Sequence, residues 1–238
     1  VKFRLLKSSN NQVVSTLMIT IHTQLIGQPQ TLTDERGTWR SAIFRTPITE
    51  PVFLQERGLT GDQVADTKHH GSPDQAVCCH PLAHYEFWNT HYKLFRKEAK
   101  LGPGSVGENW TLTNCTEADI AVGDIFQVGK AIVQVSAPRY PCTKQERKLK
   151  LPNFFNEVMT TQRTGFYLRV LTSGNVQAGD ELRLLERPNP IFTIQLINQH
   201  TLGEPDKTVA EKMLALPELA AGWKRIIEHK LKIKAKLI

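Results

Sequence analysis

Short apolar runs, separated by turns that contain glycine, fill most of this chain and constrain its fold more than any other feature. The first run, residues 18–26, alternates apolar Ile19 and Ile21 with polar neighbours and ends at Gly27, as a half-buried strand does. Comparable runs follow at residues 39–45, 51–54, 125–128, 131–135, 166–171 and 181–185. Strands this short and this numerous predict a mixed but mainly β fold, either a barrel or a folded sheet.

Two segments within this region have the spacing of helices instead. In residues 81–92, Tyr85, Trp88 and Tyr92 recur at steps of three and four, and Pro81 is suited to the first helical position. The second segment covers residues 152–163. A few helices are therefore expected beside the strands.

The pattern changes after Pro188 and Pro190. Beyond them, helices are expected at residues 194–202, 207–216 and 218–231. Three helices of this size cannot bury a sufficient core alone, so we expect them to pack on the barrel or on a partner. The expected organisation is an N-terminal extension, native or added by cloning, at residues 1–17, a main domain at residues 18–188, and a helical segment at residues 189–238.

Composition excludes several classes of protein. No run approaches the eighteen or so apolar residues that a membrane helix needs, so no membrane association is expected. The chain does not open with the charged and apolar segments of a secretory signal. The spacing of the four cysteines is not typical of a disulfide framework or a zinc knuckle; they are Cys78, Cys79, Cys115 and Cys142. Reduced thiols in a cytoplasmic protein are the simplest interpretation.

The net charge of +7 is concentrated at the C-terminus. From Trp223 onward, six lysines and arginines are opposed by one acidic residue, Glu228. Such a tail can bind polyanions without specificity, but a charged run of this kind is more commonly the solvated face of a helix. A nucleic-acid partner is therefore not expected.

Cys142 is the residue with the clearest chemical potential. Two prolines stiffen the chain before it, and three cations lie close by in the sequence, Arg139, Lys144 and Arg147. Positive charge favours the thiolate, which is the form of cysteine that attacks electrophiles and binds soft metals. The alternative is an inert cysteine, buried as a small apolar residue.

Two other patterns give weaker signals. His80 and His84 are four residues apart and could hold zinc, but no third ligand follows at a suitable spacing. The loop of residues 102–107 is rich in glycine, yet it lacks the spacing of phosphate-binding and dinucleotide-binding loops.

Several runs, taken together and in order, resemble the MOSC domain, which is named for the C-terminal domain of molybdenum-cofactor sulfurases, and its YiiM-type branch in particular. The runs are GLTGD at 58–62, AD at 65–66, KHHGSPDQAV at 68–77, Pro81 with His84, Tyr85 and Trp88, GEN at 107–109, VGD at 122–124, and QVSAPRYPCTK at 134–144. The similarity covers about residues 18–185, and the trailing helices resemble an appendage of this branch. Two positions depart from the family pattern, because Ser72 replaces a usual second glycine and Ala137 replaces a usual glutamine.

This resemblance implies a barrel that binds the molybdenum cofactor, with Cys142 as a catalytic residue and as the protein ligand to molybdenum. A thiolate is a soft donor that suits this metal. The cofactor also carries a phosphate, which arginine can bind through two hydrogen bonds, so Arg139 is the first expected contact. The other expected cofactor contacts are Lys68, Asn109, Ser136, Thr143 and Asp74.

His70 is the second catalytic candidate, as a source of protons near neutral pH. If the backbone is extended, His69 and His70 point to opposite sides and only one of them faces the site. Structural alternatives remain open at this stage. Arg139 could form an ion pair with Asp74 or Glu108, and Asp74 could simply cap a turn.

The resemblance further implies an oxidoreductase that reduces N-hydroxylated small molecules, such as hydroxylaminopurine bases, and so removes mutagenic analogues. The cysteines lack iron–sulfur spacing, so electrons are expected from an external reductase. A homodimer and, at the level of the family, pyridoxal phosphate binding are further expectations. The alternative function is a non-catalytic carrier of the cofactor, or of sulfur as a persulfide on Cys142.

Overall fold

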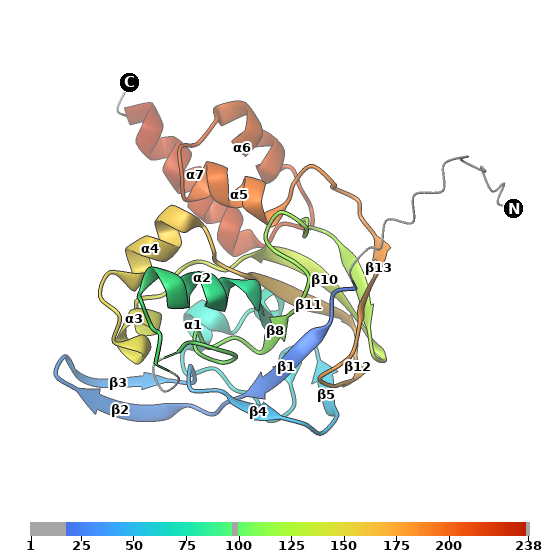
Figure 1. Ribbon diagram of the computed structural model, residues 1–238. Coiled ribbons are helices and arrows are strands. Elements are labelled where there is room, and N and C mark those ends of the chain that lie inside the picture. The colour runs from blue at the N-terminus through green and yellow to red at the C-terminus, as the bar shows by residue number, and fades with distance from the viewer. Residues whose placement is uncertain (1–17, 97–99, 237–238) are drawn as a thin grey trace, which may run out of the picture.

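The computed structural model describes residues 18–96 and 100–236 (Figure 1). The extension expected at residues 1–17 lies outside the described residues. The main element is an eight-stranded sheet with the order β13-β9-β10-β11-β7-β8-β1-β4. Its strands are β1 Ile21–Ile26, β4 Thr46–Ile48, β7 Val77–Pro81, β8 Trp110–Leu112, β9 Ile125–Val128, β10 Ala131–Pro138, β11 Phe166–Thr172 and β13 Leu182–Glu186.

This sheet curls until its two ends approach each other. An antiparallel bridge joins Thr20, just before β1, to Glu181, just before β13. The amide of Leu182 also donates to the carbonyl of Ile19, with an N–O distance of 2.9 Å. Among the described pairs of neighbouring strands, only β7 and β8 run parallel. The predicted barrel-like, mainly β sheet with helices is confirmed.

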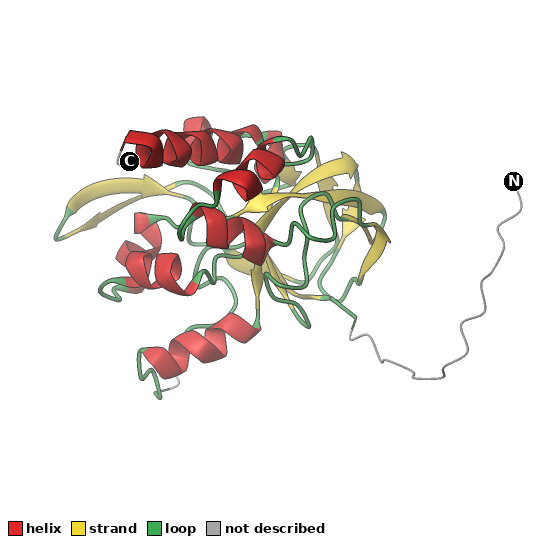
Figure 2. Ribbon diagram, turned by 90° about the horizontal axis from the view of Figure 1, so that it is seen from above, coloured by secondary structure: helices red, strands yellow, loops and turns green. Residues whose placement is uncertain are grey.

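Two smaller sheets complete the strands. One consists of β12 Gly174–Val176, β5 Val52–Gln55 and β6 Gly58–Leu59, and the other is a hairpin of β2 Gln30–Asp34 and β3 Gly37–Ser41. Figure 2 shows this hairpin projecting past the helices. Its turn end is held by Arg147, which bonds to Asp34 and lies over the ring of Trp39 at 4.8 Å.

The described helices are α1 Thr67–His70, α2 Ala83–His91, α3 Thr143–Leu149, α4 Phe154–Thr161, α5 Ile194–Thr201, α6 Lys207–Leu214 and α7 Ala221–Lys236, with a short 3₁₀ turn at Pro73–Gln75. The last three helices pack on the barrel. Packing on the barrel and packing on a partner were the two arrangements expected from the sequence. Met213 and Trp223 belong to the same buried cluster as Phe126 and Val133 of the sheet. Among the described helices, none has the length and apolar character needed to cross a membrane.

The local assignment of Pro81 was wrong. Pro81 ends β7 and does not begin a helix, and α2 starts two residues later at Ala83. All five residues of β7 are buried, because the strand lies in the middle of the sheet between β11 and β8. A strand that is buried on both faces has no alternation of apolar and polar residues, so the pattern that reveals other strands is missing here.

Residues 67–70, which contain the two adjacent histidines, form a helical turn. Asp66 caps α1, and its side chain accepts hydrogen bonds from the amides of Lys68 and His69. His69 and His70 therefore lie on consecutive positions of a helical turn, so the condition under which they would point to opposite sides is not met.

Candidate functional site

A cavity of about 370 Å³ lies where the end of β10, the start of α3 and the α1 region meet. Cys142, Arg139 and Lys144 line it together with His70. These residues come from segments some 70 positions apart in the sequence. Three of the predicted site residues, Cys142, Arg139 and His70, are thus brought to one place by the fold.

Arg139 follows β10 directly and is the most buried cation of the cavity, with 6% of its surface exposed. Its amide donates to the carbonyl of Gly165, and its Nη2 donates to the carbonyl of Val106 at 2.7 Å. Its Nη1 is buried and has no hydrogen-bond partner among the described residues. A buried charge with an unused donor is costly unless an anion accepts from it. Arg139 therefore places a buried cation with one unused donor at the wall of the cavity.

The guanidinium of Arg139 keeps its charge although it is buried. Burial acts to lower the pKa of Arg139, but the ionised forms of its neighbours act to raise it, and the net pKa lies above its ordinary value. The guanidinium group is therefore a permanent cation at the cavity wall.

The structural alternatives for Arg139 are wrong. Asp74 forms its ion pair with Arg169, at 2.9 Å between Oδ1 and Nε. Glu108 accepts instead from the hydroxyl of Tyr85 at 2.5 Å and from the amide of Gly104 at 2.8 Å. Neither carboxylate forms an ion pair with Arg139 among the described contacts.

Cys142 occupies the position just before the first residue of α3. Its amide donates to Oε1 of Gln145 at 3.3 Å, and Nε2 of Gln145 donates to the carbonyl of Val106. Arg139 donates to the same carbonyl, so Val106 holds in place both Arg139 and the turn that contains Cys142. Cys142 is the one cysteine of the described residues that is not buried. The expectation that this cysteine could be fully buried is therefore wrong.

The other three thiols are protected by burial. Burial raises the pKa of Cys78 and Cys79, and raises the pKa of Cys115 to about 12. Cys78 also lines the cavity, although only 5% of its surface is exposed. It contributes to the wall of the cavity as a neutral thiol.

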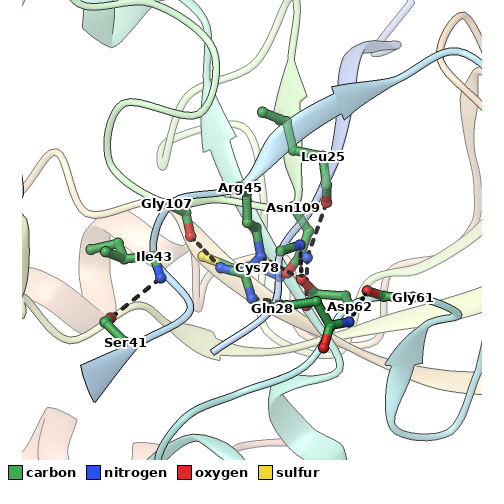
Figure 3. A network of polar contacts seen from close by, with 11 residues as sticks. Leu25, Gln28, Ser41, Ile43, Arg45, Gly61, Asp62, Cys78, Gly107 and Asn109 are labelled. Atoms are coloured by element: carbon green, nitrogen blue, oxygen red, sulfur yellow. Dashed lines mark hydrogen bonds and ion pairs between the residues drawn. The ribbon is translucent and has the colours of Figure 1, made fainter. Parts of the chain in front are cut away.

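A buried ion pair between Arg45 and Asp62 forms part of the cavity wall (Figure 3). Nε and Nη2 of Arg45 donate to Asp62 at 2.9 and 2.8 Å, and Nη1 of Arg45 donates to the carbonyl of Gly107 at 2.6 Å. Asp62 also accepts from Nδ2 of Asn109 at 2.9 Å and from the amide of Gly27 at 2.8 Å. Asp62 therefore joins three residues from distant segments.

Asn109 is largely occupied by these contacts. Its Nδ2 donates to Asp62 and to the carbonyl of Leu25, and its Oδ1 accepts from the amide of Cys78 at 3.1 Å. Asn109 lines the cavity, as expected of a cofactor contact. Only the second lone pair of its carbonyl oxygen remains for a ligand.

Four predicted contacts are not among the described residues that line the cavity: Lys68, Asp74, Ser136 and Thr143. Asp74 is engaged by Arg169. The hydroxyl of Ser136 is buried within hydrogen-bond distance of the carbonyls of Asp74 and Tyr167. Lys68 and Thr143 are exposed to solvent on α1 and α3. Direct contact between these residues and a ligand in the cavity is not supported.

The two adjacent histidines have different environments. Nδ1 of His69 lies 2.8 Å from Oδ2 of Asp66 at an exposed position, and this hydrogen bond is the first cause of the lowered pKa of Asp66. His70 lines the cavity, where burial and then the charge of Arg139 lower its pKa. The imidazole of His70 is therefore neutral at pH 7, and its expected role as a proton source near neutral pH is weakened.

His80 and His84 are buried and contact neighbouring side chains of the protein. Nε2 of His84 lies 2.7 Å from Oε2 of Glu117, and the ring of His80 packs between His84 and Tyr85, 5.2 Å from each. Among the described residues, no group of three His, Cys, Asp or Glu side chains is placed to hold a metal ion. The zinc alternative is not supported.

Lys148 of α3 provides a pH-dependent prediction. Its Nζ donates to the carbonyls of Ile43 and Gly104, at 2.9 and 2.6 Å, and burial lowers its pKa from 10.5 to about 8. Side-chain NMR of isotope-labelled lysine, with Lys148→Arg to assign the signal, should show a titration near pH 8. A midpoint near 10.5 would contradict the buried position.

The sign of the effect of Lys148 on stability follows from the same shift. The folded-state pKa lies below the unfolded-state value, so the unfolded chain binds more protons between pH 8 and pH 10.5. The contribution of Lys148 to the free energy of unfolding should therefore increase as the pH rises through that window. Below it the contribution is constant.

Some residues of the cavity carried no recognised signal in the sequence. Arg45 and Asp62 are 17 positions apart and meet only in the folded chain. Asp62 belongs to the run GLTGD at residues 58–62, whose composition by itself predicts only a turn. Tyr140 and Tyr167 also line the cavity. Tyr140 stood inside the run that contains Cys142, so the sequence did mark its neighbourhood.

Comparison with known proteins shows which family and which solved structures this chain is similar to. The MOSC domain profile matches residues 66–183. The chain is 31% identical over 194 residues to the protein YiiM of Escherichia coli, covering 80% of this chain and 84% of that protein. It is 34% identical over 164 residues to a protein of Gibberella moniliformis named reductase, covering 66% of this chain but 28% of that longer protein. The crystal structure of YiiM from Geobacillus stearothermophilus superposes with a TM-score of 0.75 and 32% identity, covering 90% of this chain and 99% of that one.

Proposed function

This chain belongs to the MOSC domain family, in its YiiM-type branch, and on that premise we propose that it binds the molybdenum cofactor and reduces N-hydroxylated compounds. Cys142 is the proposed sulfur ligand to molybdenum. The likeness to a fungal protein named reductase supports oxidoreductase chemistry. The proposed substrates are hydroxylaminopurine-type bases, the class that the resemblance implies.

One observation carries the proposal. A half-buried cysteine and a buried arginine with an unused guanidinium donor line the same cavity, and they are Cys142 and Arg139. A molybdenum cofactor needs a soft donor for its metal and a cation for its phosphate, and this pair of residues supplies both. The donor set therefore fits the group.

The reaction consumes two electrons and two protons, because the N–O bond breaks while an amine and water are released. When bound, the cofactor supplies the oxygen-accepting, two-electron chemistry. Arg139 and Lys144, which line the cavity, would offset the negative charge of the cofactor, and Cys142 would hold its metal. The neutral imidazole of His70 can donate a hydrogen bond or pass a proton on, but it is not a stored acid. An external reductase supplies the electrons.

The alternative is a carrier that holds sulfur as a persulfide on Cys142. Such a carrier needs a mobile and exposed cysteine that a partner can reach. Cys142 is held by its helix and by Gln145 at the wall of a basic cavity, and this favours a metal ligand over a persulfide carrier.

Anaerobically purified protein tests the proposal. We expect close to stoichiometric molybdenum by elemental mass spectrometry, and conversion of hydroxylaminopurine to adenine with reduced methyl viologen as the electron donor. Protein that contains molybdenum but reduces no N-hydroxylated substrate would support a non-catalytic carrier of the cofactor. Protein from molybdenum-replete cells with neither molybdenum nor reduction would contradict cofactor binding and leave only the persulfide carrier.

A further inference from the structure

Tyr140 is an aromatic residue at the rim of the cavity. It lines the cavity, and 39% of its surface is exposed, while 6% of the surface of the preceding Arg139 is exposed. Tyr140 stands between that buried cation and Cys142, two positions further along the chain. An exposed aromatic side chain is therefore held beside the proposed metal ligand.

The position of Tyr140 is well defined. Pro138 and Pro141 restrict the backbone on its two sides, and the amide of Arg139 is fixed by the carbonyl of Gly165 at 3.0 Å. The ring also contacts Trp223 of α7, which is 5% exposed. Because this segment is already ordered, no conformational entropy of the segment has to be lost when a ligand binds, and affinity is preserved.

The contact with Trp223 leaves part of the Tyr140 side chain uncovered. The two ring centroids are 6.1 Å apart and the ring planes are inclined at 59°, so the rings are tilted and not stacked. Despite this neighbour, 39% of the surface of Tyr140 is exposed. Tyr167, the other tyrosine of the cavity lining, is 8% exposed and offers no comparable surface.

We propose that Tyr140 is a specificity-determining residue, whose ring stacks on a planar heteroaromatic substrate and so favours it over a saturated substrate of similar size. Aromatic stacking of a base contributes roughly tenfold or more to affinity, and a saturated ring cannot gain it. This inference rests on the proposed reductase function, and it identifies the residue that selects the substrate class.

The experiment compares two substrates of similar size. Hydroxylaminopurine is planar, and N-cyclohexylhydroxylamine is not. With molybdenum-containing protein and reduced methyl viologen, Tyr140→Leu should lower kcat/KM for hydroxylaminopurine about tenfold, mainly through KM. It should change the value for N-cyclohexylhydroxylamine less than about twofold, and Tyr140→Phe should retain the wild-type preference. Equal losses for both substrates would overturn the proposal.

Binding of adenine provides a readout that does not depend on turnover. Calorimetric titration of the same proteins should show about tenfold weaker adenine binding for Tyr140→Leu and unchanged binding for Tyr140→Phe. Phe53→Leu is the matched control, because Phe53 is an exposed aromatic residue on β5 outside the cavity lining. If the wild type reduces neither substrate, the proposed function fails. Adenine binding that Tyr140→Leu does not weaken contradicts the stacking role in either case.

Discussion

Replacement of Cys142 by alanine is expected to remove most of the bound molybdenum and to abolish reduction of hydroxylaminopurine. The substitution deletes the soft donor but leaves the cations of the cavity in place. It should not unfold the protein, because Cys142 is half-buried and lies before the first residue of α3, outside the buried clusters. Elemental mass spectrometry on anaerobically purified protein measures the metal, and a methyl viologen assay measures the reduction.

Cys115→Ala is the matched control for this experiment. Cys115 is a free thiol in the main buried cluster and does not line the cavity. Its replacement should leave the molybdenum content near the wild-type value and lower stability only modestly. Equal molybdenum in the wild type and Cys142→Ala would contradict ligation by this sulfur. Full reduction activity in Cys142→Ala would exclude it from the chemistry altogether.

Replacement of Asp62 by alanine is expected to lower the free energy of unfolding by about 3–5 kcal/mol, the usual cost of removing one partner of a buried ion pair. The side chains of Arg45 and Asp62 are 9% and 8% exposed, so the arginine charge would remain buried without its partner. The amide of Gly27 and Nδ2 of Asn109 would lose the same acceptor. Urea denaturation monitored by circular dichroism measures the loss.

Asp74→Ala is the control, because Asp74 also pairs with an arginine but at a more exposed position. The side chains of Arg169 and Asp74 are 19% and 29% exposed, and ion pairs nearer the surface contribute at most about 1 kcal/mol. A double variant, Arg45→Met with Asp62→Leu, should recover part of the stability lost by Asp62→Ala, because it buries no unpaired charge. Equal effects of Asp62→Ala and Asp74→Ala would contradict the role assigned to burial.

Parts of the fold that depend on local signals could be predicted from the sequence. Gly129 and Lys130 separate two apolar runs, and these pair as β9 and β10 with Ala131 opposite Val128. The helices α5 and α6 begin at the expected residues and end within two residues of the expected ends, because Thr193 and Asp206 provide capping side chains at their starts. Local chemistry was sufficient for these elements. The third helix, α7, is shifted towards the C-terminus, because it runs over Ala221–Lys236 where residues 218–231 were expected.

Other elements depend on the surroundings and could not be predicted locally. The α3 segment Thr143–Leu149 consists mostly of polar residues with good helix propensity, but it lacks the apolar periodicity that would reveal a helix in the sequence. Gln145 and Lys148 hold it in place by donating to carbonyls of the loop at residues 104–106 and of Ile43. The strand that ends at Pro81 is defined by its partners β11 and β8 in the same way.

The candidate site shows the same division. Cys142 and Arg139 are close in the sequence and occur in one distinctive run, so the sequence could predict them as a pair. Arg45 and Asp62 come together only through the fold. The assignments of Lys68 and Asp74 came from a recognised run, but that run folds into short helical turns, and these direct some of its members away from the cavity.

The bridge between Thr20 and Glu181 has a consequence for biosynthesis. Its two residues are separated by most of the domain, so β1 emerges from the ribosome long before the strand region that it must meet. Until then the nascent chain exposes an incomplete sheet with unpaired edges, which are sites of aggregation. Pairings between such distant segments are also slow to form. Cells that produce this protein should therefore show a greater need for chaperones during its synthesis than for a helical protein of equal length.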